Sequence, residues 1–202
     1  MERVVKIEPT EVCDRELVTR CQRGDEAAFD ELVLRHQQRA LNVAYQLLRN
    51  HEDATEVAQD AFVKVYRNLN EFRGECEFTT WLHQIVVNLA RNKHRWWQRR
   101  GRQKTVSINA PVETPFGEIT GQFAGPTDPP DVEAVKSEFV QALGAKMAEL
   151  PGKFREVLTL RNVENMSYEE IAVALDCSVG TVKSRIARAR EQLREAMSEE
   201  GL

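Results

Sequence analysis

The segment MSYEEIAVALDCSVGTVKSRIARAREQLREA, residues 166–196, decides the fold of the carboxy-terminal part of the chain. Ser167, followed three residues later by Glu170, forms a capping box that predicts the start of a short helix. Residues 176–178 form a turn after it. Apolar side chains then recur at intervals of four, three and four residues, which indicates a second amphipathic helix. Helix, short turn and helix is the plan of a helix-turn-helix, whose second helix enters the DNA major groove.

The outer face of this second helix is suited to DNA. Residues 177–190 contain four basic residues and no acidic one. Small Ala187 allows the backbone to approach the bases, and lysine or arginine side chains reach guanine edges or phosphates. An ordinary hairpin with a solvated charged face is the alternative, and the agreement of cap, turn and register favours DNA binding. The residues predicted to face DNA are Lys183, Ser184, Ala187 and Arg188.

The rest of the 202-residue chain also has helical periodicity, and no alternating run suggests a strand. The apolar spacing predicts helices over residues 14–22, from about 25 to 48, from about 52 onward, and from after a break at 72–77 to about 100. Residues 101–131 differ, because they hold five of the seven prolines and four of the ten glycines.

The predicted fold class is therefore all-α, with two small helical domains joined by a flexible Pro/Gly-rich acidic linker. The expected bounds are residues 1–100 for the first domain, 101–131 for the linker and 132–202 for the second domain. At roughly 150 residues per domain, the length also allows two small domains.

The composition excludes several classes of protein. With 28 basic and 32 acidic residues, the formal charge of −4 excludes a uniformly basic nucleic-acid coat protein. No apolar run approaches the roughly 20 residues that span a bilayer, and the charged amino terminus is unlike a signal peptide, so we expect a cytoplasmic protein with no membrane insertion. The four cysteines are widely spaced, so no metal site, disulfide framework or cofactor is expected.

A second concentration of positive charge lies before the linker. Residues 78–112 contain seven basic residues and no acidic one, and Trp96 and Trp97 interrupt them. Basic side chains beside aromatic rings are typical of surfaces that bind single-stranded nucleic acid. Trp81 is expected in the core. For Phe72, the pattern leaves core packing and a base contact equally open.

An acidic stripe is predicted on the third helix, where Asp53, Glu56 and Asp60 recur at helical spacing with Gln59 beside them. Such a stripe repels DNA. It is either solvated surface or a docking face for a basic protein partner.

Three blocks of the sequence together resemble a known family. They are DATEVAQDAFVKVYRNLNEFRG (53–74), FTTWLHQIVVNLARN (78–92) and LPGKFREVLTLRNVENMSYEEIAVALDCSVGTVKSRIARAR (150–190). In content and order they are similar to the extracytoplasmic-function (ECF) sigma factors, the small two-domain promoter-recognition subunits of bacterial RNA polymerase, and to the sigma-E type among them.

The resemblance implies partners and roles. The first domain would be sigma region 2 and the second sigma region 4, with core RNA polymerase (β′ clamp helices and β subunit), promoter DNA and an anti-sigma factor as partners. The acidic helix would dock on the β′ clamp helices, and the outer face of the second carboxy-terminal helix would read the minus-thirty-five element. Phe72 would line a pocket for a flipped-out base, and Asn88, Arg91 and Asn92 would contact the minus-ten element.

Two alternatives remain at this point. A stand-alone helix-turn-helix regulator would use the same carboxy-terminal helices without polymerase. An enzyme acting on DNA, such as a recombinase, would need a nucleophile or clustered metal-binding carboxylates, and the sequence displays neither, so no catalytic residue is predicted.

Overall fold

The computed structural model describes residues 12–100 and 143–198, in which every regular element is a helix. The linker expected at 101–131 lies outside the described residues. The amino-terminal unit consists of α1 (Asp14–Gln22), α2 (Glu26–Leu48), α3 (His51–Asn68), the 3-10 turn η1 (Leu69–Glu71) and α4 (Phe78–Arg99).

The carboxy-terminal unit begins with helical residues 143–149. It continues with α6 (Gly152–Asn162), α7 (Tyr168–Leu175) and α8 (Val179–Ser198). The all-α prediction is confirmed, and the predicted helix-turn-helix is formed by α7 and α8.

Local capping explains where several of these helices begin. The side chain of Asp25 accepts a hydrogen bond from the Ala28 amide at the start of α2, and that of Asn50 accepts one from the Asp53 amide at the start of α3. These side chains satisfy amides that have no partner inside the helix. The break before α4 contains Gly74 at φ 72°, a left-handed conformation that glycine adopts without steric cost.

The capping box predicted at α7 is present in both directions. The Glu170 amide donates to Ser167 Oγ at 3.1 Å, and the Ser167 amide donates to Glu170 Oε2 at 2.7 Å. Asp176, the residue after the end of α7, has a φ of 50° and turns the chain toward α8. Ser178 Oγ then accepts the Thr181 amide and caps α8. The turn that sets the angle between α7 and α8 is therefore fixed by short-range hydrogen bonds.

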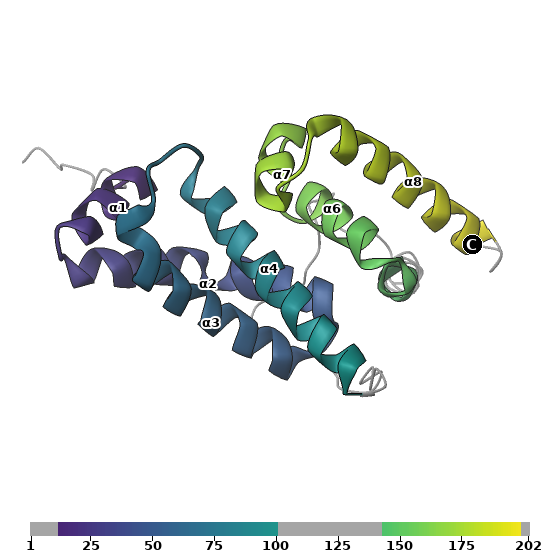
Figure 1. Cartoon of the computed structure of the whole chain (residues 1–202), viewed down its shortest axis with the longest axis horizontal. Coiled ribbons are helices and arrows are strands. Elements are labelled where there is room, and N and C mark those ends of the chain that lie inside the picture. The colour runs from purple at the N-terminus through teal and green to yellow at the C-terminus, as the bar shows by residue number, and fades with distance from the viewer. Residues whose placement is uncertain (1–11, 101–142, 199–202) are drawn as a thin grey trace, which may run out of the picture.

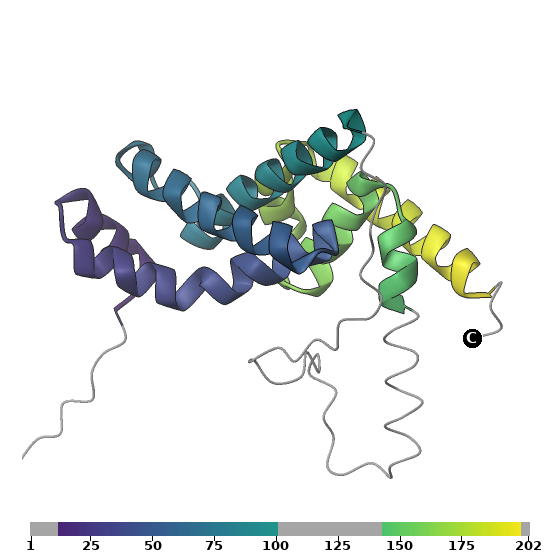
Figure 2. The same ribbon diagram turned by 90° about the horizontal axis from the view of Figure 1, so that it is seen from below.

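Both units contribute to one continuous cluster of buried apolar side chains. α4 packs against α7 and α2 packs against α6, so the two units lie side by side, with α8 on an outer edge (Figures 1 and 2). Fully buried members of the shared cluster include Leu32, Val65, Leu82, Val86, Val157, Leu160, Ile171 and Val182. A smaller cluster of Leu150, Phe154, Leu158 and Ala189 joins α6 to α8.

Among the described residues, no helix combines the length and apolar character needed to cross a bilayer.

Candidate nucleic-acid interface

The four residues predicted to read duplex DNA lie together on the exposed side of α8. Lys183, Ser184, Ala187 and Arg188 are all exposed. The opposite side of the helix is buried through Val182, Ile186 and Ala189, as the apolar spacing predicted. Burying that side leaves a basic face with a small residue at its middle, and such a face can enter the major groove.

Phe72 both packs against other aromatic side chains and lines a cavity. Its ring stacks on Trp81, with centroids 4.7 Å apart and planes 27° apart, and it meets Phe78 edge-on. Trp81 packs against the core, as expected. Phe72 also lines a cavity of about 260 Å³. The cavity is lined by residues of α1, of the break and of the start of α4: Arg15, Val18, Thr19, Gln22, Phe72, Arg73, Gly74, Cys76, Glu77 and Phe78.

Gln22, the last residue of α1, has a structural part that no pattern in the sequence indicated. Its side-chain amide donates to the carbonyl of Leu69 at 2.8 Å and to that of Phe72 at 3.0 Å. One amide group therefore ties α1 to both ends of the short segment that carries Phe72. Gln22 is 47 positions from Leu69 and 50 from Phe72 along the chain, so spacing could not have revealed these contacts.

The remaining minus-ten candidates lie further along α4. Asn88 and Asn92 are exposed. Arg91 is half-buried, because its guanidinium forms a bidentate pair with Glu156 of α6 at 2.8 and 2.7 Å. At 1.5 Å per residue, these positions lie about 15 Å or more from the helix start near Phe72. The structure thus brings the three α4 residues together, separately from Phe72.

The two adjacent tryptophans of α4 have different surroundings. Trp97 packs against the core cluster. The ring of Trp96 is faced by two cations, with the Arg100 guanidinium carbon 4.5 Å and Lys93 Nζ 5.8 Å from the ring centroid. Trp97 thus packs inward, whereas the ring of Trp96 lies beside basic side chains.

The acidic stripe on α3 divides into an exposed part and a buried residue. Glu56, Gln59 and Asp60 are exposed, whereas Asp53 is buried. Lys93 of α4 lies 3.0 Å from the Asp53 carboxylate and 2.6 Å from that of Glu56. Burial lowers the pKa of Lys93, but its bonds to Glu56 and Asp53 outweigh burial and raise it.

The exposed part of this stripe continues into apolar side chains. Val63 and Tyr66 follow Asp60 at intervals of three residues, and both are exposed. Residues three apart are neighbours on a helix surface. We call Glu56, Gln59, Asp60, Val63 and Tyr66 the α3 face.

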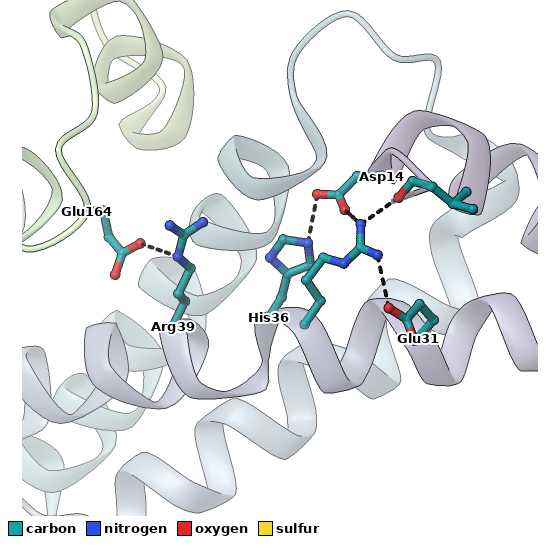
Figure 3. Close-up of polar contacts among 7 residues, drawn as sticks. Asp14, Glu31, His36, Arg39 and Glu164 are labelled. Carbon is teal, nitrogen blue, oxygen red and sulfur yellow. Dashed lines mark hydrogen bonds and ion pairs between the residues drawn. The ribbon is translucent and has the colours of Figure 1, made fainter. Parts of the chain in front are cut away.

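Polar contacts hold the start of α1 against α2. Arg35 donates to the Val12 carbonyl and to the Asp14 carboxylate, and His36 Nε2 lies 2.7 Å from Asp14 (Figure 3). Burial lowers the pKa of His36, against the opposing effect of Asp14. α1 also supplies part of the wall of the Phe72 cavity, through Arg15, Val18, Thr19 and Gln22.

The cysteines of the described residues are all free thiols. Burial raises the pKa of the Cys21 and Cys76 thiols, which lowers their reactive thiolate fraction. Within residues 12–100 and 143–198, no group of three or more His, Cys, Asp or Glu side chains is placed to hold a metal ion.

Comparison with known proteins gives family matches in both units. The family model described as "Sigma-70 region 2" matches residues 32–102, and the one described as "Sigma-70, region 4" matches residues 140–193. Among curated relatives, the RNA polymerase sigma-H factor of Pseudomonas aeruginosa is 39% identical over 93% of this chain and 95% of its own. The ECF RNA polymerase sigma-E factor of Escherichia coli K12 is 37% identical over 91% and 93%.

Solved structures that share the fold include CnrH and the sigma factor RpoE. CnrH, solved in complex with the cytosolic domain of CnrY, is 26% identical with a TM-score of 0.66, over 92% of this chain and 97% of that one. The sigma factor RpoE of Bartonella quintana, solved with the anti-sigma factor NepR, is 24% identical with a TM-score of 0.59, over 84% and 96%.

Proposed function

The chain belongs to the extracytoplasmic-function (ECF) sigma factors of RNA polymerase, and from that premise we propose how its surfaces divide the work. A sigma factor directs the polymerase to specific promoters in the cytoplasm and is not itself an enzyme. This decides against both alternatives left by the sequence, since a stand-alone regulator would not carry region 2 and a recombinase would be an enzyme.

The exposed side of α8 reads the minus-thirty-five element. Lys183 and Arg188 supply the positive charge, Ser184 is a hydrogen-bonding group, and Ala187 leaves room for the bases. All four project from a helix whose other side is fixed by burial, so the contacts would be made by a rigid element, as in other helix-turn-helix proteins.

The Phe72 cavity takes an unpaired base of the minus-ten element. Its volume of about 260 Å³ suits one base, and Phe72 offers an aromatic wall. Because Trp81 already supports Phe72, the ring is held in place before DNA arrives. The strand that leaves that pocket would contact Asn88, Arg91 and Asn92 on α4. Its phosphates would then bind the basic carboxy-terminal end of α4.

The α3 face docks on core polymerase. It combines exposed acidic groups with the exposed aromatic Tyr66, and a charged rim beside an aromatic anchor is typical of protein interfaces. Asp53 supports this face from within through Lys93. The partner surface on the β′ clamp helices, and any contact with the β subunit, would have to be basic and apolar in complement.

A protein inhibitor of the anti-sigma class is a further proposed partner. CnrH, which shares this fold, was solved with the cytosolic domain of CnrY. The family resemblance of the sequence points the same way. We also propose the bounds 1–100 and 132–202 for the DNA-opening and duplex-reading domains, with 101–131 as the connection.

One observation carries this proposal: a single chain presents an exposed basic face on α8, an aromatic-walled cavity before α4 and an exposed acidic face on α3. The test is transcription in vitro with purified core polymerase on candidate promoters. We expect promoter-dependent transcripts, fewer with Arg188→Ala, and no change with Arg194→Ala, an exposed arginine further along α8.

The cost of Arg188→Ala in binding the upstream element should be about 1 to 3 kcal/mol if the contact is to a base edge. If no promoter-dependent transcript forms with any candidate, the proposal fails. If Arg188→Ala and Arg194→Ala have equal effects, the assignment of the reading face on α8 is wrong.

A further inference from the structure

The surface where the amino-terminal and carboxy-terminal units meet includes a residue that the proposed function assigns to DNA. α4 lies against α7, and α2 against α6 (Figure 1). In this arrangement one edge of the Arg91 guanidinium faces a carboxylate of α6 instead of solvent. Nε and Nη2 donate to the two carboxylate oxygens of Glu156, at 2.8 and 2.7 Å.

This pairing uses the same donors that nucleic acid would need. A guanidinium binds a carboxylate, a phosphate or the edge of guanine through two parallel N–H groups. The Glu156 carboxylate occupies two such groups of Arg91, and its side chain is only 9% exposed. Arg91 therefore cannot make a bidentate contact to DNA through this edge while α6 stays in place.

Three further polar contacts hold the units together. Arg155, next to Glu156, is buried and donates to the Leu47 carbonyl at the end of α2, at 2.7 Å. In the segment after α6, the side chain of Glu164 is only 5% exposed and lies 3.4 Å from His83 Nε2 of α4 and 3.9 Å from Arg39 Nε of α2 (Figure 3 draws the contact with Arg39). Together with the shared apolar cluster, these contacts build a packed interface with buried charges.

In this arrangement the two helices proposed to bind DNA, α4 and α8, lie too close together to reach two promoter elements. Packed helices lie 8 to 10 Å apart, so α8, separated from α4 by α7, lies roughly 20 Å from it. Two elements separated by two helical turns of DNA are roughly 70 Å apart. The chain in this arrangement could not hold both elements at once.

We propose that the face of α4 around Arg91 is a shared docking surface, occupied by the carboxy-terminal unit in the free chain and by the minus-ten strand after the two units separate. Glu156 acts as the internal competitor of DNA for Arg91. The assignment of Arg91 to DNA rests on the proposed function, whereas the closed arrangement does not.

The test uses the full chain with two readouts. Two dyes, attached through non-natural amino acids at exposed positions 67 and 194, report the separation of the units by energy transfer. Anisotropy of a labelled non-template strand, taken from a promoter that the holoenzyme transcribes, reports DNA binding by the free chain. The variant is Glu156→Gln. The matched control is Glu149→Gln, which changes a carboxylate of the same unit that is 68% exposed.

We expect Glu156→Gln to lower energy transfer and to tighten strand binding by about tenfold, since hydrogen bonds to charged groups are worth this much or more. Glu149→Gln should change neither. Arg91→Glu should also open the chain, and combining it with Glu156→Arg should restore the closed energy transfer without restoring DNA binding. That rescue separates loss of a contact from misfolding.

If Glu156→Gln leaves the energy transfer unchanged, or if the double variant does not restore it, then the Arg91–Glu156 ion pair does not hold the units in the closed arrangement. Opening without tighter strand binding would overturn the competition for Arg91. A failure of the proposed function itself is recognised separately, because the wild-type holoenzyme would then produce no promoter-dependent transcript while the energy-transfer result still stands.

Discussion

The side-chain amide of Gln22, at the end of α1, donates a hydrogen bond of 3.0 Å to the main-chain carbonyl of Phe72, 50 residues later. The same nitrogen donates to the Leu69 carbonyl at 2.8 Å. A helix of the amino-terminal unit thereby fixes both ends of the short segment that forms the aromatic wall of the cavity.

The first prediction concerns this link. Gln22→Leu removes both hydrogen bonds and should cost about 1 kcal/mol of folding stability, but it should reduce promoter opening more strongly because the Phe72 segment is no longer held. Gln22→Glu, of the same size, should be at least as harmful, since its carboxylate repels the two carbonyls. Permanganate footprinting of holoenzyme at the minus-ten element measures opening.

The matched control is Gln192→Leu, which changes an exposed glutamine on α8. It should leave opening unchanged. If Gln22→Leu opens promoters as well as wild type does, Gln22 has no part in positioning Phe72.

The second prediction separates two aspartates of one helix. Asp60 is exposed on the α3 face, and Asp53 is buried beside Lys93 at 3.0 Å. Asp60→Lys should weaken assembly with core polymerase about tenfold with folding stability within about 0.5 kcal/mol of wild type. Asp53→Asn should instead destabilise the fold by about 1 to 3 kcal/mol, because it weakens a partly buried pair.

Core affinity is measured by competition for labelled core enzyme, and stability by urea unfolding. The prediction is contradicted if Asp53→Asn lowers core affinity more than Asp60→Lys does at a temperature where both variants are folded.

The third prediction concerns the capping box of the helix-turn-helix. Ser167→Ala removes the Oγ that accepts the Glu170 amide and should cost about 1 kcal/mol of the free energy of unfolding. The bond from the Ser167 amide lowers the pKa of Glu170, so the contribution of Glu170 is present at neutral pH and is lost on acidification through its folded pKa.

Urea unfolding at pH 7 checks this value. Ser198→Ala is the control, because that hydroxyl bonds only back to the Arg194 carbonyl near the exposed end of α8. Equal effects of the two substitutions would show that the capping box contributes nothing beyond an ordinary surface serine.

The helices were predictable because their signals are local. Ser167 and Glu170 are three residues apart and cap α7 as expected, and the apolar spacing of α8 fixed which side is exposed. The distant contacts were not predictable. Arg91 and Glu156 are 65 positions apart, and each alone resembles an ordinary surface charge.

Asp53 illustrates a different limit of the sequence. Its spacing places it on the acidic stripe with Glu56 and Asp60. The stripe covers a wide part of the helix surface, however, and Asp53 at its edge is buried. Only the position of Lys93 on α4 decides which edge is buried. Helical periodicity gives the angle of a residue around its own helix and says little about which neighbour packs there.

The last prediction concerns pH and His83, a buried residue of α4. Burial lowers its pKa to about 4, with Arg39 and His36 acting in the same direction and Glu170 opposing them. Above pH 6.5, His83 is neutral in both the folded and the unfolded chain. As the pH falls from there toward 4, His83 becomes protonated in the unfolded chain but stays neutral in the folded chain. The free energy of unfolding therefore decreases over this range.

Between pH 7 and pH 5, this difference corresponds to a loss of about 2 kcal/mol. His36, whose pKa burial also lowers, adds to the loss. Glu164 acts in the opposite sense, because burial raises its pKa against the effect of Arg39. The folded carboxyl therefore gains its proton at a higher pH than the unfolded one, and its contribution to stability grows on acidification.

Urea unfolding at pH 7 and pH 5 tests these signs. The loss of stability should be smaller in His83→Gln than in wild type, and larger in Glu164→Gln. The control His51→Gln changes an exposed histidine and should keep the wild-type loss. A pH dependence in His83→Gln equal to that of wild type would show that His83 titrates in the folded chain as it does in the unfolded one, and that the packing of α4 against the segment after α6 does not exclude its proton.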